Sequence, residues 1–176
     1  MKSITYLLFL AFPLALADPA SAWEAVYGPA VSEDQASRGV TPVPGCGLHG
    51  PGYVAVGTQN VIGASDVYVV FTDILGNAVW ERTYDILGGS QVDEGVDIVP
   101  VPGGYVFLSN TQNFVWLPAL TSIDCDGLVN WTRVYYDMVA SYDLRGHDLI
   151  RTQTGDPAWH CRGRPRGGRS VVERRQ

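Results

Sequence analysis

The chain has 176 residues, of which 46% are hydrophobic and 17% are charged, so it has the length and composition of one globular domain and not of a disordered chain. The formal net charge is −6 at pH 7, although six of the 12 basic residues lie within 160–176. The rest of the chain is therefore strongly acidic, which argues against nucleic-acid binding by the folded part.

The N-terminal segment has the organisation of a secretory signal peptide. Lys2 precedes an apolar run over 4–17 and small residues at 20–22, the order expected for a signal cleaved after Ala22. The run is shorter than the roughly 20 residues that a membrane-spanning helix needs. We expect 1–22 to be removed, leaving a mature protein that is secreted, periplasmic or on the cell surface and has no membrane span.

A repeated pattern follows a lead segment over 23–37, and it occupies 38–159 as about two and a half units with a period of about 51 residues. The matches keep the same order along the chain. They are Asp73 with Asp124, Gly76 with Gly127, Trp80 with Trp131, Arg82 with Arg133, Tyr84 with Tyr135, Gly52-Tyr53-Val54 with Gly104-Tyr105-Val106, Thr58-Gln59-Asn60 with Thr111-Gln112-Asn113, Gly95 with Gly146 and Asp97 with Asp148.

Each unit has the pattern of four short strands. Residues 66–84 hold two apolar runs around Gly76-Asn77, and 95–110 hold two more around Gly103-Gly104, which is typical of β-hairpins. Four strands in about 50 residues match one blade of a β-propeller. We therefore expect an all-β fold of four-stranded antiparallel blades. Because propellers contain about four to eight blades, these units form an incomplete ring.

The stretch 79–111, which runs from the end of the first unit into the second, resembles the secreted bacterial propeller repeats that read W-x-[KR]-x-[FY]-GGS-x-x-D-E, strand, GGY, strand. The residues that carry this resemblance, within a similarity over about 38–150, are Trp80, Arg82, Tyr84, Gly88-Gly89-Ser90, Asp93-Glu94 and Gly103-Gly104-Tyr105. The resemblance implies a propeller fold and export, and no particular reaction. Two departures stand out: Pro118 predicts a short or edge strand, and the first unit has extra residues at 46–51.

The repeated turns and tryptophans have a structural interpretation. The turns at Gly76-Asn77 and Asp126-Gly127 need residues that accept positive φ. We expect Trp80 and Trp131 to pack between neighbouring blades, where a large aromatic side chain buries the most area, and not to stack on a ligand.

The three cysteines leave two alternatives open. Either Cys46 and Cys125 form a disulfide and Cys161 is free, or all three are unpaired, because their spacing matches no disulfide framework. No CxxC pair is present, which argues against a zinc site.

The repeat pattern stops after residue 150, and 160–176 form an arginine-rich tail. One interpretation is a disordered basic tail that binds an acidic partner. The other is that the gene is truncated or read in a shifted frame, so that further blades are encoded downstream in another frame. The break within a unit favours the second.

The chemistry-bearing residues give two candidate sites. Asp124 and Asp126 resemble part of a calcium loop, because Ca²⁺ prefers oxygen ligands, but a plain Asp-Gly turn explains them more simply. Asp93, Glu94 and Asp97 are a candidate ligand-binding cluster in a loop between blades. His49, His147 and His160 are too scattered for a catalytic or zinc motif, and we expect His49 in a loop and His147 in a strand.

The function expected from these patterns is an exported, non-catalytic repeat protein that serves as a binding or scaffold module of the cell envelope or extracellular space. Its partner would be a protein or a glycan, calcium is the one cofactor considered, and an open stack of blades favours self-association. The alternatives are a fragment of a secreted propeller enzyme, either a hydrolase or lyase or a quinoprotein dehydrogenase, and a gene remnant without selected activity.

Overall fold

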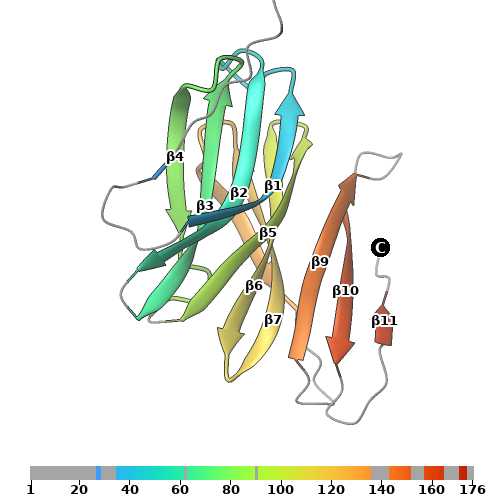
Figure 1. The fold of residues 1–176 in the computed structure, drawn as a ribbon. Helices are drawn as coiled ribbons and strands as arrows, with labels where there is room; N and C mark the ends of the chain where they lie inside the picture. The colour runs from blue at the N-terminus through green and yellow to red at the C-terminus, as the bar shows by residue number, and fades with distance from the viewer. Residues whose placement is uncertain are drawn as a thin grey trace, which may run out of the picture.

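A computed structural model of the chain describes residues 27–28, 35–61, 63–89, 91–135, 143–151, 157–164 and 171–173. Every regular element in these residues is a β-strand, which confirms the all-β prediction (Figure 1). Within the described part there is no helix with the length and apolarity to cross a membrane. The expected signal peptide, 1–22, lies outside the described residues.

The first eight strands form two antiparallel meanders of four strands each. The first meander comprises β1 (Gln35–Val43), β2 (Gly52–Val61), β3 (Ala64–Asp73) and β4 (Ala78–Tyr84), and the second comprises β5 (Val92–Val101), β6 (Gly104–Asn113), β7 (Val115–Asp124) and β8 (Val129–Val134). A single parallel pair, Ser65 with Val92, joins β3 to β5. The eight strands therefore make one sheet that is not closed.

The two meanders have the same strand registers. Gly52 pairs with Asp73 in the first meander, and Gly104 pairs with Asp124 in the second. Each opening strand also carries one extra residue, between Ser37 and Gly39 in β1 and between Gly95 and Asp97 in β5. Such a β-bulge increases the local twist of its strand.

One sequence match does not correspond to equivalent strand positions. β2 and β6 both have ten residues and begin at the matched Gly-Tyr-Val segments, so the position of Thr58 in β2 is taken by Asn110 in β6. The Thr-Gln-Asn match therefore places Thr111 one position out of step with Thr58. A shift of one residue reverses the face of a strand on which a side chain lies.

The β3–β4 and β7–β8 turns are built alike. Gly76 and Gly127 have φ of 83° and 79°, as the sequence predicts for these glycines. In each turn the leading carboxylate accepts two backbone N–H groups: Asp73 Oδ1 from Leu75 and Asn77, and Asp124 Oδ1 from Asp126 and Leu128. The repeated aspartates thus close the turns.

The prediction of a short or edge strand at Pro118 is wrong for the strand as a whole, because β7 is full length and lies between β6 and β8, although Pro118 itself lies beyond the β7–β8 pairs. β7 has ten residues and pairs with β6 along its whole length. The backbone carbonyl of Pro118 accepts the N–H of Tyr135 just beyond β8. The nitrogen of Pro118 faces this same side of the strand, beyond the last β7–β8 pair. Its lack of an N–H therefore removes no hydrogen bond between β7 and β6.

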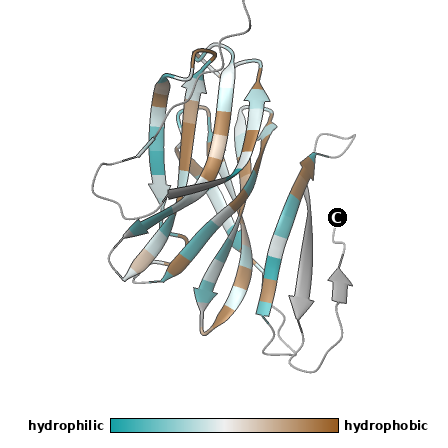
Figure 2. Ribbon diagram, in the orientation of Figure 1, coloured by the Kyte–Doolittle hydropathy of each residue, from teal (hydrophilic) through white to brown (hydrophobic). Residues whose placement is uncertain are grey.

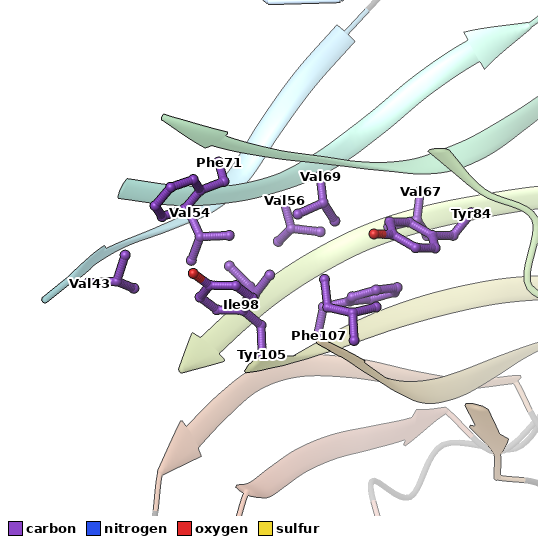
Figure 3. Packing of buried hydrophobic residues seen from close by; sticks show 11 residues of the cluster. Val43, Val54, Val56, Val67, Val69, Phe71, Tyr84, Ile98, Tyr105 and Phe107 are labelled. Atoms are coloured by element: carbon purple, nitrogen blue, oxygen red, sulfur yellow. The ribbon is translucent and has the colours of Figure 1, made fainter. Parts of the chain in front are cut away.

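The main core lies between the two meanders, which pack face to face (Figures 2 and 3). Valines of β2 and β3 contact aromatic and aliphatic residues of β5, β6 and β7. The buried members of this cluster are Val43, Val54, Val56, Val67, Val69, Phe71, Tyr84, Ile98, Tyr105, Phe107 and Ile123. Full burial of each such side chain contributes about 1.5–3 kcal/mol, so this interface stabilises the fold substantially.

Trp80 is partly buried and packs against the edge of this core. Its ring centroid lies 6.0 Å from that of Phe71 and 6.3 Å from that of Tyr105, and its Nε1–H donates to the carbonyl of Cys125 at 2.9 Å. Tyr84, on the same strand, donates its hydroxyl to the carbonyl of Gly127 at 2.8 Å. The outer strand of the first meander is therefore fastened to the β7–β8 turn of the second.

The other face of the second meander packs against β9 (Asp143–Arg151) through Val99, Val106, Leu108, Leu120 and Leu149. Asn110 bonds both the N–H and the carbonyl of Gly146, at 2.7 and 3.1 Å. Asp97 Oδ2 accepts the N–H of Leu149 at 3.0 Å. β9 pairs with β10 (Pro157–Arg164), and β10 with β11 (Val171–Glu173), so the arginine-rich segment contributes strands to a separate three-stranded sheet.

Candidate functional site

Three carboxylates from separate parts of the chain meet at one end of the meanders. Asp66 lies near the start of β3, Asp85 directly follows β4, and Asp93 lies near the start of β5. One oxygen from each lies within 4.8 Å of the others. Within the described residues this is the group of side chains that could hold a metal ion.

The loop after β4 positions Asp85. Its two carboxylate oxygens accept the N–H groups of Gly88 and Gly89, at 2.7 and 3.0 Å. Both glycines have positive φ, 79° and 99°, which a residue with a side chain rarely adopts. The Gly-Gly pair of the repeat motif therefore folds the loop back onto Asp85.

Asp93 is the buried member of the cluster, with 1% of its surface exposed. Its Oδ2 accepts the N–H of Ile86 at 2.7 Å. Its Oδ1 is buried and has no hydrogen-bond partner of acceptable geometry among the described residues. An unpaired buried carboxylate oxygen is costly, and each such atom in a native protein calls for an explanation.

The electrostatic environment of the cluster is unfavourable to three negative charges. Burial raises the pKa of Asp93, and the charges of Asp85 and Asp66 raise it further, while the Ile86 N–H and the nearby Thr111 hydroxyl oppose the rise. Burial and the charge of Asp85 also raise the pKa of Asp66. These carboxylates are therefore stabilised by a bound proton or by a bound cation.

Other oxygen atoms of the surrounding strands are also buried without partners. Gln59 lies opposite Asp66 in the β2–β3 pair, and Thr111 lies opposite Asp93 in the β5–β6 pair. Directly opposed side chains share a face, with Cβ atoms about 4.5–5.5 Å apart. Gln59 Oε1 and Gln91 Oε1, the latter at the end of the same loop, are buried and have no hydrogen-bond partner among the described residues, while the Thr111 hydroxyl interacts with the carboxylate of Asp93.

The structure separates the three acidic residues that the sequence suggested as a ligand-binding cluster. All three lie within strand β5 and not in a loop. Asp93 joins Asp66 and Asp85 in the acidic cluster. Glu94 instead forms ion pairs: its Oε2 lies 3.2 Å from Nη1 of Arg145 and 3.9 Å from Nη2 of Arg38. The carboxylate of Asp97 accepts hydrogen bonds from the backbone N–H groups of Ile98 and Leu149. Burial raises the pKa of this carboxylate. One of the three thus takes part in the acidic cluster.

The suggested calcium residues Asp124 and Asp126 lie at the opposite end of the meanders. Asp124 closes the β7–β8 turn, and Asp126 Oδ1 lies 2.7 Å from Nε2 of His49 in the β1–β2 loop. The same two loops are joined by a disulfide between Cys46 and Cys125. The extra residues at 46–51 therefore supply the covalent link between the meanders. The side chain of Cys161 lies outside the described residues.

Sequence reasoning missed Asp66 and Asp85 because neither belongs to a compact motif. Asp85 does precede the Gly-Gly pair at the spacing that a loop-closing carboxylate needs, and this was the available signal. Asp66 gives no such signal, since only the strand register brings it to the other two. Comparison with known protein families finds no matching family model, and comparison with curated proteins finds no significantly similar sequence.

Proposed function

We propose that the chain is an exported, non-catalytic module of propeller-type blades that serves as a scaffold or binding unit of the cell envelope or extracellular space. The observation that carries the proposal is the junction between the meanders, where the outer strand of one is fastened to a turn of the next through Trp80 and Tyr84. A junction of this kind can be repeated from unit to unit, as in other repeat proteins.

A second contact of the same kind supports a repeating junction. The hydroxyl of Tyr27 donates to the carbonyl of Gly76 at 2.6 Å, as Tyr84 does to Gly127. Residues 23–27 also read W-E-x-x-Y, the same spacing as 80–84. The lead segment therefore carries the outer-strand motif of a blade, and its tyrosine lies where a preceding blade would contact the first meander.

The disulfide supports export. Cys46 and Cys125 are 79 residues apart and link the two meanders. Disulfides form and persist in oxidising compartments such as the periplasm or the extracellular space. Together with the N-terminal signal pattern, the disulfide favours a protein that folds after export.

Three pairs that could carry chemistry hold the fold together instead. Cys46 is bonded to Cys125, His49 contacts Asp126, and Glu94 contacts Arg145. Each pair joins segments that are far apart in the sequence, and the disulfide removes both thiols as nucleophiles. These uses favour a structural or binding role over an enzyme.

Expression of the whole chain in a bacterial host, with analysis of the exported fraction by intact mass and disulfide mapping, tests export. We expect an N-terminus at Trp23 and a linked peptide pair that contains Cys46 and Cys125. A chain that stays in the cytoplasm with Met1 present and both cysteines reduced would contradict the proposal.

A crystal structure tests the blade assignment. Successive meanders related by one constant rotation about a common axis would support propeller-type blades. Two meanders that close on each other as a sandwich, with the third sheet attached in an unrelated orientation, would contradict the assignment and leave export unaffected.

A further inference from the structure

We propose that Asp66, Asp85 and Asp93 bind a calcium ion that holds the first and second meanders together at the end opposite the disulfide. The proposal does not need the propeller assignment, because β3, the loop after β4, and β5 bring the three carboxylates together in any description of the fold.

The geometry of the cluster suits Ca²⁺. This ion takes about six to eight oxygen ligands at about 2.3–2.6 Å, so oxygens on opposite sides of it are roughly 5 Å apart. The three carboxylate oxygens lie within 4.8 Å of one another and can therefore share one ion. Asp85 is exposed and Asp93 is buried. An ion bound between them could therefore enter from solvent on the Asp85 side and bind a buried carboxylate on the other.

The unpaired oxygens are the second, independent observation. Asp93 Oδ1 is buried and has no hydrogen bond of good geometry, although the Thr111 hydroxyl interacts with the same carboxylate and Oδ2 accepts the N–H of Ile86. Gln59 is 8% exposed, lies opposite Asp66 in the sheet, and has an unpartnered Oε1. A bound cation would satisfy both oxygens, because carboxylate and amide oxygens are the ligands that Ca²⁺ prefers.

The position of the site gives the ion a structural role. The meanders share one parallel residue pair at this end, Ser65 with Val92, next to Asp66 and Asp93. Ser65 Oγ also donates to the carbonyl of Asp93, at 3.2 Å. Few backbone bonds therefore join β3 to β5, and an ion held by both strands would bridge them where the disulfide does not reach.

The test is a calcium titration of the purified whole chain with its disulfide intact, followed by calorimetry and by thermal unfolding in EDTA or in 1 mM CaCl₂. We expect one binding site per chain and a Tm that is roughly 5–10 °C higher with calcium. Asp66→Asn and Asp93→Asn should abolish both effects. Asp126→Asn, which changes an exposed aspartate at the other end, is the matched control and should retain them.

Each other outcome overturns the proposal. Wild-type protein that neither binds calcium nor gains Tm has no such site. Loss of the effect in Asp126→Asn with retention in Asp66→Asn would place binding at the β7–β8 turn. If calcium leaves the Tm of wild type unchanged and both Asn variants melt higher than wild type with and without calcium, the carboxylates repel one another and hold no metal. Asp66 is only half-buried, so its variant keeps the test decisive should Asp93→Asn fail to fold.

Discussion

At the scale of single residues, the same motif has two different outcomes in the two meanders. Trp80 packs against Phe71 and donates to the carbonyl of Cys125, whereas Trp131 is 37% exposed, with the guanidinium of Arg133 5.2 Å from its ring centroid. Trp80 therefore packs at the interface between the two meanders, as expected for a structural tryptophan. Trp131 lacks an equivalent covering turn among the described residues.

This difference predicts unequal effects of the same substitution. Trp80→Phe removes a partly buried hydrogen bond and ring contacts and should lower the free energy of unfolding by about 1–2 kcal/mol. Trp131→Phe, the matched control, should lower the free energy of unfolding by less than about 0.5 kcal/mol. Urea unfolding followed by circular dichroism measures both. Equal losses would mean that the outer face of β8 is covered in solution.

The acidic cluster predicts a pH dependence in the absence of metal. The folded state raises the pKa of Asp93 above the value of 3.8 expected for an unfolded chain, through burial and through the charges of Asp85 and Asp66. The folded protein therefore binds more protons than the unfolded chain between pH 3.8 and this raised value, and its stability falls as pH increases through that range.

Asp93→Asn removes this effect, so its unfolding free energy in EDTA should exceed that of wild type most at pH 7. The advantage should shrink as the pH approaches 4, where Asp93 of the wild type is protonated. Urea unfolding of both proteins at several pH values measures it. A constant difference across the range would show that burial of Asp93 is not coupled to its ionisation.

At the scale of elements, much of the first two meanders was predictable, because local chemistry determines a hairpin. Gly76, Gly103 and Gly127 take positive φ at the turns where the sequence expects them. Alternation along β3 places Val67, Val69 and Phe71 on the core face, as a period of two requires. The strand around Pro118 was misjudged because its missing N–H lies past the end of β8, a tertiary detail.

The pairings between meanders were the part that the sequence could not decide. The choice between a Cys46–Cys125 bond and free thiols depends on the approach of two loops 79 residues apart. The candidate site depends on strand register in the same way, since Asp66 reaches Asp93 only because β3 lies beside β5. Local patterns do not carry information about such approaches.

The disulfide predicts a large effect of reduction. It closes a loop of about 80 residues, and restricting the unfolded chain in this way contributes roughly 4 kcal/mol in the chain-entropy model. A double Cys46→Ser and Cys125→Ser variant should lose about this much free energy of unfolding in guanidinium titrations, and dithiothreitol should have no further effect on it. A variant as stable as the oxidised wild type would show that the bond is not formed in the folded protein.

At the scale of the whole molecule, the junction between meanders leaves complementary surfaces at both ends of the pair. The β8 surface, which comprises Leu128, Val129 and Trp131, is exposed at 57%, 53% and 37%. The β3–β4 turn of the first meander has the same construction as the turn that covers Trp80, and its Ile74 and Leu75 are exposed at 61% and 70%. The turn of one copy can therefore cover the β8 surface of another.

This complementarity predicts head-to-tail self-association, because a surface and a turn at opposite ends of each molecule do not satisfy each other within one copy. Sedimentation velocity should show a mass that grows with protein concentration. Trp131→Glu should shift the distribution to monomer, whereas Leu48→Glu, which changes an exposed leucine in the β1–β2 loop, should not. Tyr27 donates to Gly76 in the same turn and competes with the partner, so Tyr27→Phe should strengthen association. A monomer at every concentration, in all four proteins, would exclude this contact.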